Sequence, residues 1–334
     1  MILLSLLDRS VNSKYLGRFN FFYLSVFIVT AFSGFRFGVG WDYMSYYEAV
    51  IYDDSFHFIS RNEKITQLLI SLSNRFNTPN LFFFINSFIT VFLISDTIKK
   101  YSINKNISLF IFISFPLFFL NSFSVIRFFT ALALTFYGVR FIINKKFIFY
   151  LIIVLIASFI HKSAFFALPL YFLQFFKFKN IYLFIILVSA NILREIFNNL
   201  ISVYIPQYIG YTESTLVQEG TKAIWLFIFF GLIGMYFKNK YFKDNKLHDL
   251  YFNIYIYGLL FYMLFLKQGT LGHRLSLYGT IYLILLLPMY INIIKNVKIK
   301  SIAIFFLYSI LITSFLFSLH LGSNTYIPYK TIWH

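Results

Sequence analysis

The sequence predicts an all-α protein: a polytopic transmembrane helical bundle of about eleven spans. Hydrophobic residues make up 59% of the 334 residues, charged residues only 12%, and the mean hydropathy is +0.74. Soluble chains carry about 25% charged residues on average, so this composition could not cover a water-exposed surface. The apolar residues also form runs of roughly 20, the length that a helix needs to cross a bilayer. We therefore expect an integral membrane protein.

Eleven apolar runs are the expected spans. The number can range from ten to twelve, because 147–161 and 163–177 are short and could be broken or merged. No cleavable signal peptide is expected, since the apolar start Met1–Leu7 is too short for one. The runs are 19–35, 79–98, 107–122, 123–143, 147–161, 163–177, 181–197, 222–237, 250–267, 273–294 and 301–320.

Residues 1–334 are expected to form a single integral-membrane domain. Two outer loops, near 36–78 and 198–221, are long enough to fold over a ligand. Within the first loop, residues 63–77 carry a helical apolar stripe but are too short and too polar to span. This stretch is expected to be a surface-lying or re-entrant helix.

The basic residues predict the orientation of the chain. With the N-terminus in the cytoplasm, 18 of the 29 basic residues lie on the cytoplasmic side, which agrees with the positive-inside rule. Most of the net charge of +17 is then an orientation signal, and nucleic acid is not an expected partner. We expect a multi-pass protein of a bacterial cytoplasmic (inner) membrane.

Lysine and arginine are distributed differently. Fifteen of the 20 lysines lie on the cytoplasmic side, whereas six of the nine arginines lie outside. Arginine binds phosphate and carboxylate groups bidentately, so its excess outside predicts chemistry on that face. The six outer arginines are Arg36, Arg61, Arg75, Arg127, Arg194 and Arg274.

The densest polar cluster is Phe35–Tyr47 (FRFGVGWDYMSYY), at the outer end of the first expected span. Two glycines allow a sharp backbone turn, which would bring the segment back along the membrane surface. Asp42 lies among tyrosines, including Tyr46, that could stack on sugar rings. The alternative is an aromatic belt anchored by an Arg36–Asp42 pair.

Three further positions carry charge at outer turns. Arg127 lies just inside a span, where insertion costs about 2.5–3.5 kcal/mol; snorkelling to headgroups is the alternative to a function. His161-Lys162 joins two apolar runs, and histidine can exchange a proton near neutral pH, although a helix cap is also possible. Arg274 opens a late span with Tyr278 one turn deeper on the same face, or else belongs to a plain interfacial turn.

Several other classes of chemistry lack a motif. The chain has no cysteine, no phosphate-binding glycine loop and no Gly-x-Ser-x-Gly sequence. Asp53-Asp54 could suggest a metal site, but two adjacent acids in a polar loop are more typical of a solvated surface. We therefore expect no metal and no cofactor.

Taken together, five blocks resemble the EpsG family of bacterial exopolysaccharide polymerases, which is related to the Wzy-type O-antigen and capsule polymerases. In chain order they are RFGVGWDYMSYY, Glu63, Arg127, IHKSA around His161, and HRLSLY around Arg274. The resemblance covers most of the chain in span layout but only these blocks in residue identity. Members often begin with an additional span, for which Met1–Leu7 is too short.

The resemblance implies a GT-C-like membrane glycosyltransferase whose site faces the periplasm or cell exterior. Its substrates would be undecaprenyl-pyrophosphate-linked oligosaccharides within membrane lipid, with a chain-length regulator protein as a further partner. The enzyme would invert the anomeric centre and polymerise repeat units into O-antigen, capsule or exopolysaccharide.

The expected residue roles follow from this chemistry. Arg36, Arg127, Arg274 and Lys162 would hold the pyrophosphate. Asp42 or His161 would accept the proton of the acceptor hydroxyl, and the sequence does not decide between them. Glycan and pyrophosphate contacts are also expected from Glu63, Tyr46 and Tyr278.

Three alternatives remain open at this stage. An O-antigen ligase would use the same lipid-linked donor and show the same outer arginines. A lipid-linked-sugar transporter or flippase should carry charges along a central path and contain internal repeats, often inverted. A membrane acyltransferase would also use a histidine but should place it near a cytoplasmic acyl donor or a transmembrane channel.

Overall fold

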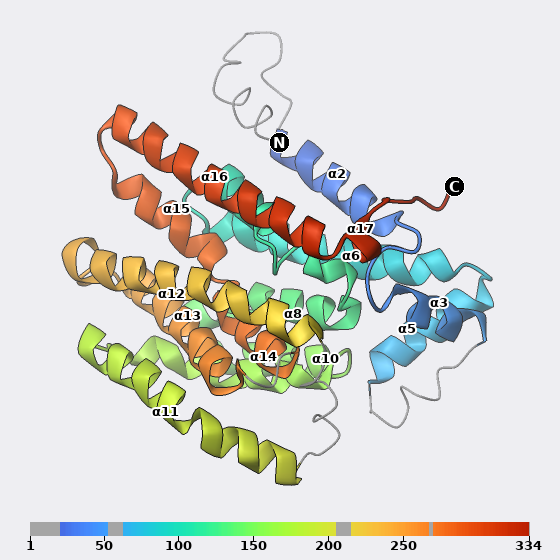
Figure 1. Cartoon of the computed structure of the whole chain (residues 1–334), viewed down its shortest axis with the longest axis horizontal. Coiled ribbons are helices and arrows are strands. Elements are labelled where there is room, and N and C mark those ends of the chain that lie inside the picture. Colours follow the sequence, from blue (N-terminus) through green and yellow to red (C-terminus); the bar gives the residue numbers. More distant parts are fainter. Residues whose placement is uncertain (1–20, 53–62, 205–214, 267–269, 334) are drawn as a thin grey trace. The chain divides into compact units, whose positions relative to one another are not determined.

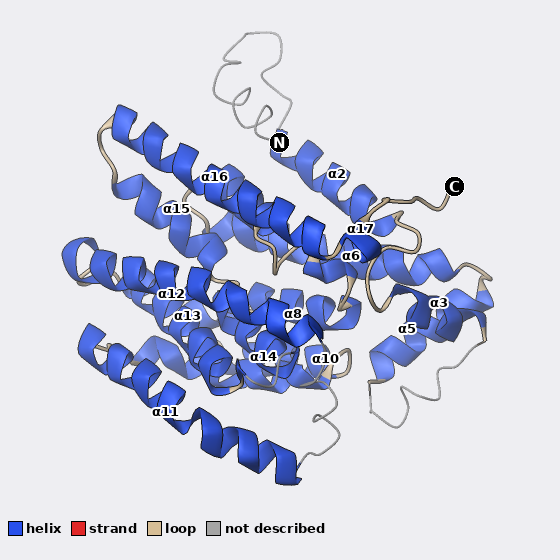
Figure 2. Ribbon diagram, viewed as in Figure 1, coloured by secondary structure: helices blue, strands red, loops and turns tan. Residues whose placement is uncertain are grey.

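The computed structural model describes residues 21–52, 63–204, 215–266 and 270–333. The described residues are helical, with one isolated antiparallel bridge between Arg36 and Thr331 and no strand (Figure 2). The predicted all-α class is confirmed. The helices are α2 (Phe21–Gly34), α3 (Tyr43–Ile51), α5 (Lys64–Arg75), α6 (Pro79–Tyr101), α7 (Lys105–Ser114), η1 (Asn121–Phe123), α8 (Ile126–Tyr137), α9 (Val139–Ile143), α10 (Phe147–Ser158), η2 (Lys162–Phe175), α11 (Asn180–Tyr204), α12 (Thr215–Tyr241), α13 (Lys246–Leu264), α14 (Thr270–Thr280), α15 (Leu283–Ile293), α16 (Val297–Leu321) and α17 (Ser323–Tyr326).

Each of the eleven apolar runs contains a helix or part of one within the described residues. By length and composition, four helical stretches within the described residues can cross a membrane: 79–101, 126–143, 180–197 and 297–321. The consecutive helices α14 and α15 qualify as a fifth if they form one broken span. The chain is thus a helical membrane protein, while the count of about eleven spans remains a prediction.

Residues 162–175 form a type of helix that the sequence did not predict. This run forms a 3-10 helix, η2, which contains Pro169. A 3-10 helix rises about 2.0 Å per residue, so 14 residues extend over about 28 Å. That length is close to the roughly 30 Å of a bilayer core, although the run is too short to span as an α-helix.

Segments 36–78 and 198–221 were expected to be long outer loops, but both contain helices. The first holds α3 and α5, and the stripe at 63–77 does form a helix, as expected. In the second, α11 continues to Tyr204 and α12 starts at Thr215. Residues 53–62 and 205–214, which include Asp53, Asp54 and Arg61, lie outside the described residues.

The described helices divide into two compact units. The first unit comprises the described residues within 1–137, 155–162 and 287–334. In it, α6 packs against α2, α5 and α8, and Figure 1 shows α3 and α5 side by side near the first turns of α6. An aromatic cluster around Tyr43, Tyr46, Phe82 and Phe83 fills the space between α3 and α6. This cluster supports most of the candidate site.

The second unit comprises residues 138–154 and 163–286. Its closest helix pair is α13 with α14, where a Cβ added to Gly258 would lie 2.5 Å from the Ser276 carbonyl oxygen. A Cβ on Gly279 would similarly lie 2.3 Å from the Ile254 carbonyl oxygen. Small residues let two helix backbones touch, which is a common way to pack helices in a bilayer.

Two helices leave most of their apolar surface uncovered. In the most apolar stretch of α16 only 11% is buried within the protein, and in that of α11 only 17%. Exposed side chains such as Phe305, Phe306 and Ile192 would be unfavourable in water but suit a lipid environment. These faces are the expected lipid-contacting surfaces.

Candidate active site

The segment that follows α2 makes the sharp turn expected from its glycines. Gly38 and Gly40 have φ angles of +67° and +113°, in the region that favours glycine. A Cβ on Gly40 would lie 2.2 Å from the carbonyl oxygen of Phe123, whereas a Cβ on Gly38 would meet no atom within 4 Å. Gly40 therefore allows the loop to lie directly against η1, and α3 then starts at Tyr43.

Arg36 is completely buried inside this turn, with 0% of its surface exposed. Its Nε donates to the Val39 carbonyl oxygen at 3.2 Å, and its Nη2 donates to the Phe123 carbonyl oxygen at 3.3 Å. Its Nη1 donates to the Ser33 carbonyl oxygen and, at 3.2 Å, to the Ser87 hydroxyl. The guanidinium thus ties the end of α2, the glycine turn, α6 and η1 together.

Aromatic rings complete the surroundings of this guanidinium. Its carbon lies 4.8 Å from the ring centroid of Phe123 and 5.5 Å from that of Phe83. Burial lowers the pKa of Arg36 to about 10, so the side chain stays protonated at neutral pH. Burial also raises the pKa of the neighbouring Tyr43 to about 12. Arg36 lies too deep to present its charge at a surface, and its geometry is that of a positioning residue.

The C-terminal segment packs onto the same turn, within the first unit. The Phe37 amide donates to the Lys330 carbonyl oxygen at 2.9 Å, and the Ile332 amide donates to the Phe35 carbonyl oxygen at 3.1 Å. The ring of Tyr329 stacks on that of Phe32, with centroids 4.1 Å apart. We call residues 322–333 the C-terminal strap; Figure 1 shows it beside the end of α2.

Arg127 lies in the first turn of α8, with 8% of its surface exposed. The positive end of a helix dipole is an unfavourable place for a cation, so a compensating acid is needed. Glu63 provides it: its Oε2 accepts from the Arg127 Nη1 in a buried ion pair. The Arg127 Nε also donates to the Tyr46 hydroxyl, and the guanidinium lies 5.4 Å from the Tyr46 ring centroid.

The other Glu63 oxygen reaches the His161-Lys162 turn. Its Oε1 accepts from the Lys162 amide at 3.4 Å. The adjacent helix α5 is joined to the same turn twice, from the Ile65 amide to the Phe159 carbonyl oxygen at 3.1 Å and from the Thr66 hydroxyl to the Ile160 carbonyl oxygen at 3.0 Å. The Lys162 side chain is exposed, so its ammonium is presented at the surface of this cluster.

The two candidate proton acceptors both lie at the edge of the first unit. His161 is partly exposed, and its ring meets that of Phe128, next to Arg127, edge-on at 5.7 Å. Asp42 precedes α3 and is also partly exposed, and its carbonyl oxygen accepts from the Tyr46 amide at 3.2 Å. Neither residue is fully buried.

Four segments far apart in sequence thus converge in the first unit: the glycine turn with α3, the start of α5, the start of α8 and the His161-Lys162 turn. A scan against protein-family models matches residues 19–331 to one model, described as the EpsG family. The match covers nearly the whole chain and includes every segment of the cluster. The chain belongs to the EpsG family.

No curated protein and no solved structure gives a significant match to the chain. Its membership in the EpsG family therefore rests on the family model, and the resemblance noted in the sequence is confirmed. As expected for such a protein, the chain has several helices that are apolar enough to cross a membrane.

Two of the candidate residues of this EpsG-family chain belong to the second unit. Arg274 and Tyr278 lie one turn apart on α14, as their spacing indicated. The Tyr278 hydroxyl lies 2.9 Å from that of Ser163, the residue directly after Lys162 in the chain. The Nε of Arg274 is buried, and the described residues provide no hydrogen-bond partner for it. This unpaired donor marks Arg274 as a group that could hold an anionic ligand.

Two further arginines that were expected on the outer side lie apart from these clusters. Arg75 ends α5 in an exposed position. Arg194 lies on α11, with its Nη2 3.7 Å from the Glu195 carboxylate. These arginines therefore do not form one common site. Among the described residues, no three histidine or acidic side chains gather as a metal-binding group would require.

The structure also reveals polar residues that sequence reasoning overlooked. Ser33 and Ser87 support Arg36, and the Ser33 hydroxyl donates to that of Ser87 at 2.9 Å. Behind Arg127, the Thr130 hydroxyl donates to the Asn86 Oδ1 at 2.8 Å. A buried polar side chain in an apolar span needs a partner. Asn86, within the expected span 79–98, could therefore have indicated a buried polar contact.

Proposed function

We propose that this EpsG-family chain is a membrane glycosyltransferase that polymerises oligosaccharide repeat units carried on undecaprenyl pyrophosphate. The product would be an exopolysaccharide, capsule or O-antigen chain. Family membership supports the class of activity. The observation that carries the residue assignment is the cluster formed by Tyr46, Glu63, Arg127 and the His161-Lys162 turn in the first unit.

The reaction needs a base and a stabilised leaving group. The acceptor hydroxyl oxygen attacks the anomeric carbon of the donor glycan, the carbon–oxygen bond to pyrophosphate breaks, and the lipid pyrophosphate leaves. The hydroxyl proton passes to Asp42 or His161, both of which are partly exposed. Attack opposite the leaving group inverts the anomeric centre.

The leaving pyrophosphate gains negative charge as the bond breaks. Cations that are already fixed in position stabilise such charge without reorganisation, and we propose that they do so here without a metal. Arg127 is fixed by Glu63 and Tyr46, and the exposed Lys162 adds an ammonium at the same cluster. Because Arg127 and Glu63 neutralise each other, Lys162 supplies the net positive charge.

Arg36 takes a different role from the one its sequence position suggested. Its donors are directed at carbonyl oxygens and Ser87, so we propose that it holds the glycine turn and thereby positions Asp42. In the second unit, Arg274 has a buried Nε without a partner and is proposed to bind substrate phosphate, with Tyr278 beside it.

Aromatic residues next to Asp42 are suited to sugars. Trp41 is 52% exposed, and its amide is held by the Ser124 hydroxyl at 3.2 Å. Aromatic faces pack against the apolar faces of sugar rings, so an exposed indole on a backbone held in place suits glycan binding. We propose that Trp41 and Tyr47 contact the repeat unit nearest the reacting carbon.

The site is proposed to face the periplasm or cell exterior, with the N-terminus in the cytoplasm. The lysine distribution supports this orientation. On that side of the membrane the donor must carry its own leaving group, and lipid pyrophosphate is such a group.

The test is polymerisation by the purified chain of a defined undecaprenyl-pyrophosphate repeat unit, in buffer with EDTA, with product length read on a gel. Wild-type protein should give a ladder of products, and Arg127→Ala should give none. Arg75→Ala removes an exposed arginine at the end of α5 and should leave the ladder unchanged. A full ladder from Arg127→Ala would overturn the assignment.

A ligase is separated from a polymerase by deletion of the gene in its host. Loss of a polymerase leaves single repeat units attached to the final acceptor, whereas loss of a ligase leaves none. Single attached units are the result expected here.

A further inference from the structure

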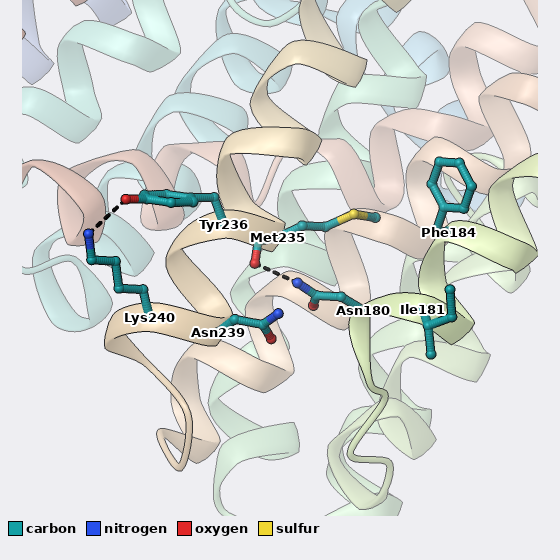
Figure 3. A pocket seen from close by; sticks show the side chains of 7 residues that line it. All are labelled: Asn180, Ile181, Phe184, Met235, Tyr236, Asn239 and Lys240. Atoms are coloured by element: carbon teal, nitrogen blue, oxygen red, sulfur yellow. Dashed lines mark hydrogen bonds between the residues drawn. The ribbon is translucent and has the colours of Figure 1, made fainter.

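A cavity of about 580 Å³ lies in the second unit, between the first turn of α11 and the last turns of α12. Small-molecule sites in proteins commonly have volumes of about 300–1,000 Å³. Figure 3 shows Asn180 and Asn239 close together between the two helices, with Ile181 and Phe184 on the α11 side. The cavity takes no part in the glycosyl-transfer chemistry proposed above.

The cavity lining changes from polar to apolar along α11. Asn180 is the first residue of that helix, and Ile181 and Phe184 follow within one turn. On α12, Asn239 and Lys240 lie one turn closer to the helix end than Met235 and Tyr236. One end of the cavity therefore suits a polar group and the other an apolar chain.

The polar end of the cavity is positively charged. The Lys240 Nζ donates to the Tyr236 hydroxyl at 2.8 Å, a neutral partner that leaves the charge of the ammonium in place. By contrast, Lys177 pairs with Asp244 at 2.8 Å and Lys238 with Asp249 at 3.5 Å. Residues 177–180 and 235–249 together contain six lysines and two aspartates. An anion would be favoured here.

Contacts within the second unit fix the walls of the cavity. The Asn180 Nδ2 donates to the Met235 carbonyl oxygen at 2.5 Å, which joins α11 directly to α12. The Lys238 Nζ donates to the Phe178 carbonyl oxygen at 2.8 Å. The Asn253 Nδ2 donates to the Phe176 carbonyl oxygen at 2.9 Å, so α13 also holds the segment before α11. A preformed cavity requires little ordering when a ligand binds.

We infer that this cavity binds an anionic glycerophospholipid, with its phosphate at Lys240 and an acyl chain along Ile181 and Phe184. A lipid fits better than a free phosphate, because only 17% of the apolar stretch of α11 is buried within the protein. The other 83% is uncovered. A lipid can therefore reach the cavity sideways from the bilayer. Basic pockets between helices on the cytoplasmic side are typical sites for anionic headgroups, and the lysine distribution puts this end of α11 and α12 on that side.

The experiment is native mass spectrometry of the full chain, purified in detergent, after equilibration with phosphatidylglycerol or phosphatidylcholine. Wild-type protein should retain phosphatidylglycerol at least about tenfold more strongly, equivalent to about 1.4 kcal/mol. Lys240→Gln should abolish this preference, and Lys240→Arg should restore it. Lys295→Gln, which changes an exposed lysine before α16, is the matched control and should retain the preference.

A second measurement locates the lipid. A phosphatidylglycerol with a photoreactive acyl chain should label the peptides that contain Ile181 and Phe184, and soluble glycerophosphoglycerol should not displace it. Equal retention of the two lipids by wild-type protein would overturn the inference. Labelling spread evenly over the helices would do the same, as would displacement by the soluble headgroup, which would indicate a free phosphate site.

Discussion

The Nη1 of Arg127 donates to the Oε2 of Glu63, a residue 64 positions earlier in the chain, and both side chains are buried. Arg127 lies near the positive end of α8, which disfavours its charge, whereas Glu63 lies at the N-terminus of α5, where the helix dipole favours a carboxylate. The pair joins the start of α8 to the start of α5. Its second carboxylate oxygen extends the connection to the Lys162 amide.

The first prediction concerns this ion pair. Glu63→Gln should leave the Arg127 guanidinium buried without a counter-charge, which costs about 3–5 kcal/mol. The variant should unfold at a lower temperature in detergent and should no longer extend glycans. Lys64→Gln, which alters the exposed neighbour, is the control and should behave as wild type. A Glu63→Gln protein with normal stability would contradict the buried pair.

A second prediction separates the role of Arg36 from that of a phosphate ligand. Lysine keeps the charge of arginine but lacks the planar set of donors that reaches Val39, Ser87 and Phe123. Arg36→Lys should therefore lower thermal stability as well as product length, since each hydrogen bond from a charged group contributes about 1.5–3 kcal/mol. Lost polymerisation at unchanged stability would instead indicate direct contact with substrate.

The two glycines of the turn should respond differently to alanine. Gly40→Ala would place a Cβ 2.2 Å from the Phe123 carbonyl oxygen, so the turn would have to move away from η1 and activity should be lost. Gly38→Ala meets open space and should cost only the strain of a left-handed residue, about 1–2 kcal/mol. Chain length on a gel and the unfolding temperature measure both effects. Equal behaviour of the two variants would refute this explanation.

The identity of the proton acceptor can be decided by a pair of substitutions. General base catalysis contributes about 10²- to 10⁴-fold, so either Asp42→Asn or His161→Gln should slow chain growth at least about 100-fold. Both residues are partly exposed, and neither substitution should reduce binding of the lipid-linked donor. Single-turnover rates and donor binding, measured separately, distinguish the cases. Near-normal rates in both variants would exclude this pair from the role.

His248, which precedes the expected span 250–267, should make the protein sensitive to acid. Burial, together with the nearby Lys238 charge, lowers the pKa of His248 from 6.5 to about 3. As the pH falls, His248 is therefore protonated in the unfolded chain before it is protonated in the folded chain. The free energy of unfolding should decrease as the pH drops from about 6.5 to about 3, by at most about 1.4 kcal/mol per pH unit.

His248→Phe should remove this acid-dependent loss, because phenylalanine cannot titrate and can still stack on Phe242, whose ring lies 4.3 Å from that of His248. Unfolding temperatures between pH 4 and pH 7 measure the difference between the variant and the wild type. His320→Gln, at an exposed position near the end of α16, should keep the wild-type profile. An unchanged profile in His248→Phe would assign the acid sensitivity to other groups.

The sequence predicted the helices, because a bilayer requires backbone polar groups to be paired internally. The cost of a cation in a span also singled out Arg127, but the sequence did not predict its ion pair with Glu63. It also indicated that the Phe35–Tyr47 segment turns sharply. It could not predict the partners of Arg36, since these are mostly backbone carbonyl oxygens, which every segment possesses. The 3-10 geometry of residues 162–175 was also not predicted, because Pro169 permits a kinked α-helix as well.

The pairing of the C-terminal strap with the glycine turn sets an order for biogenesis. The Phe35 carbonyl oxygen and the Phe37 amide are hydrogen-bonded to Ile332 and Lys330, residues that leave the ribosome almost 300 peptide bonds later. The helices in between can insert one after another, but the turn that carries Asp42 is completed last. A stalled or prematurely ended chain would therefore lack the backbone hydrogen bonds that the C-terminal strap makes to this turn.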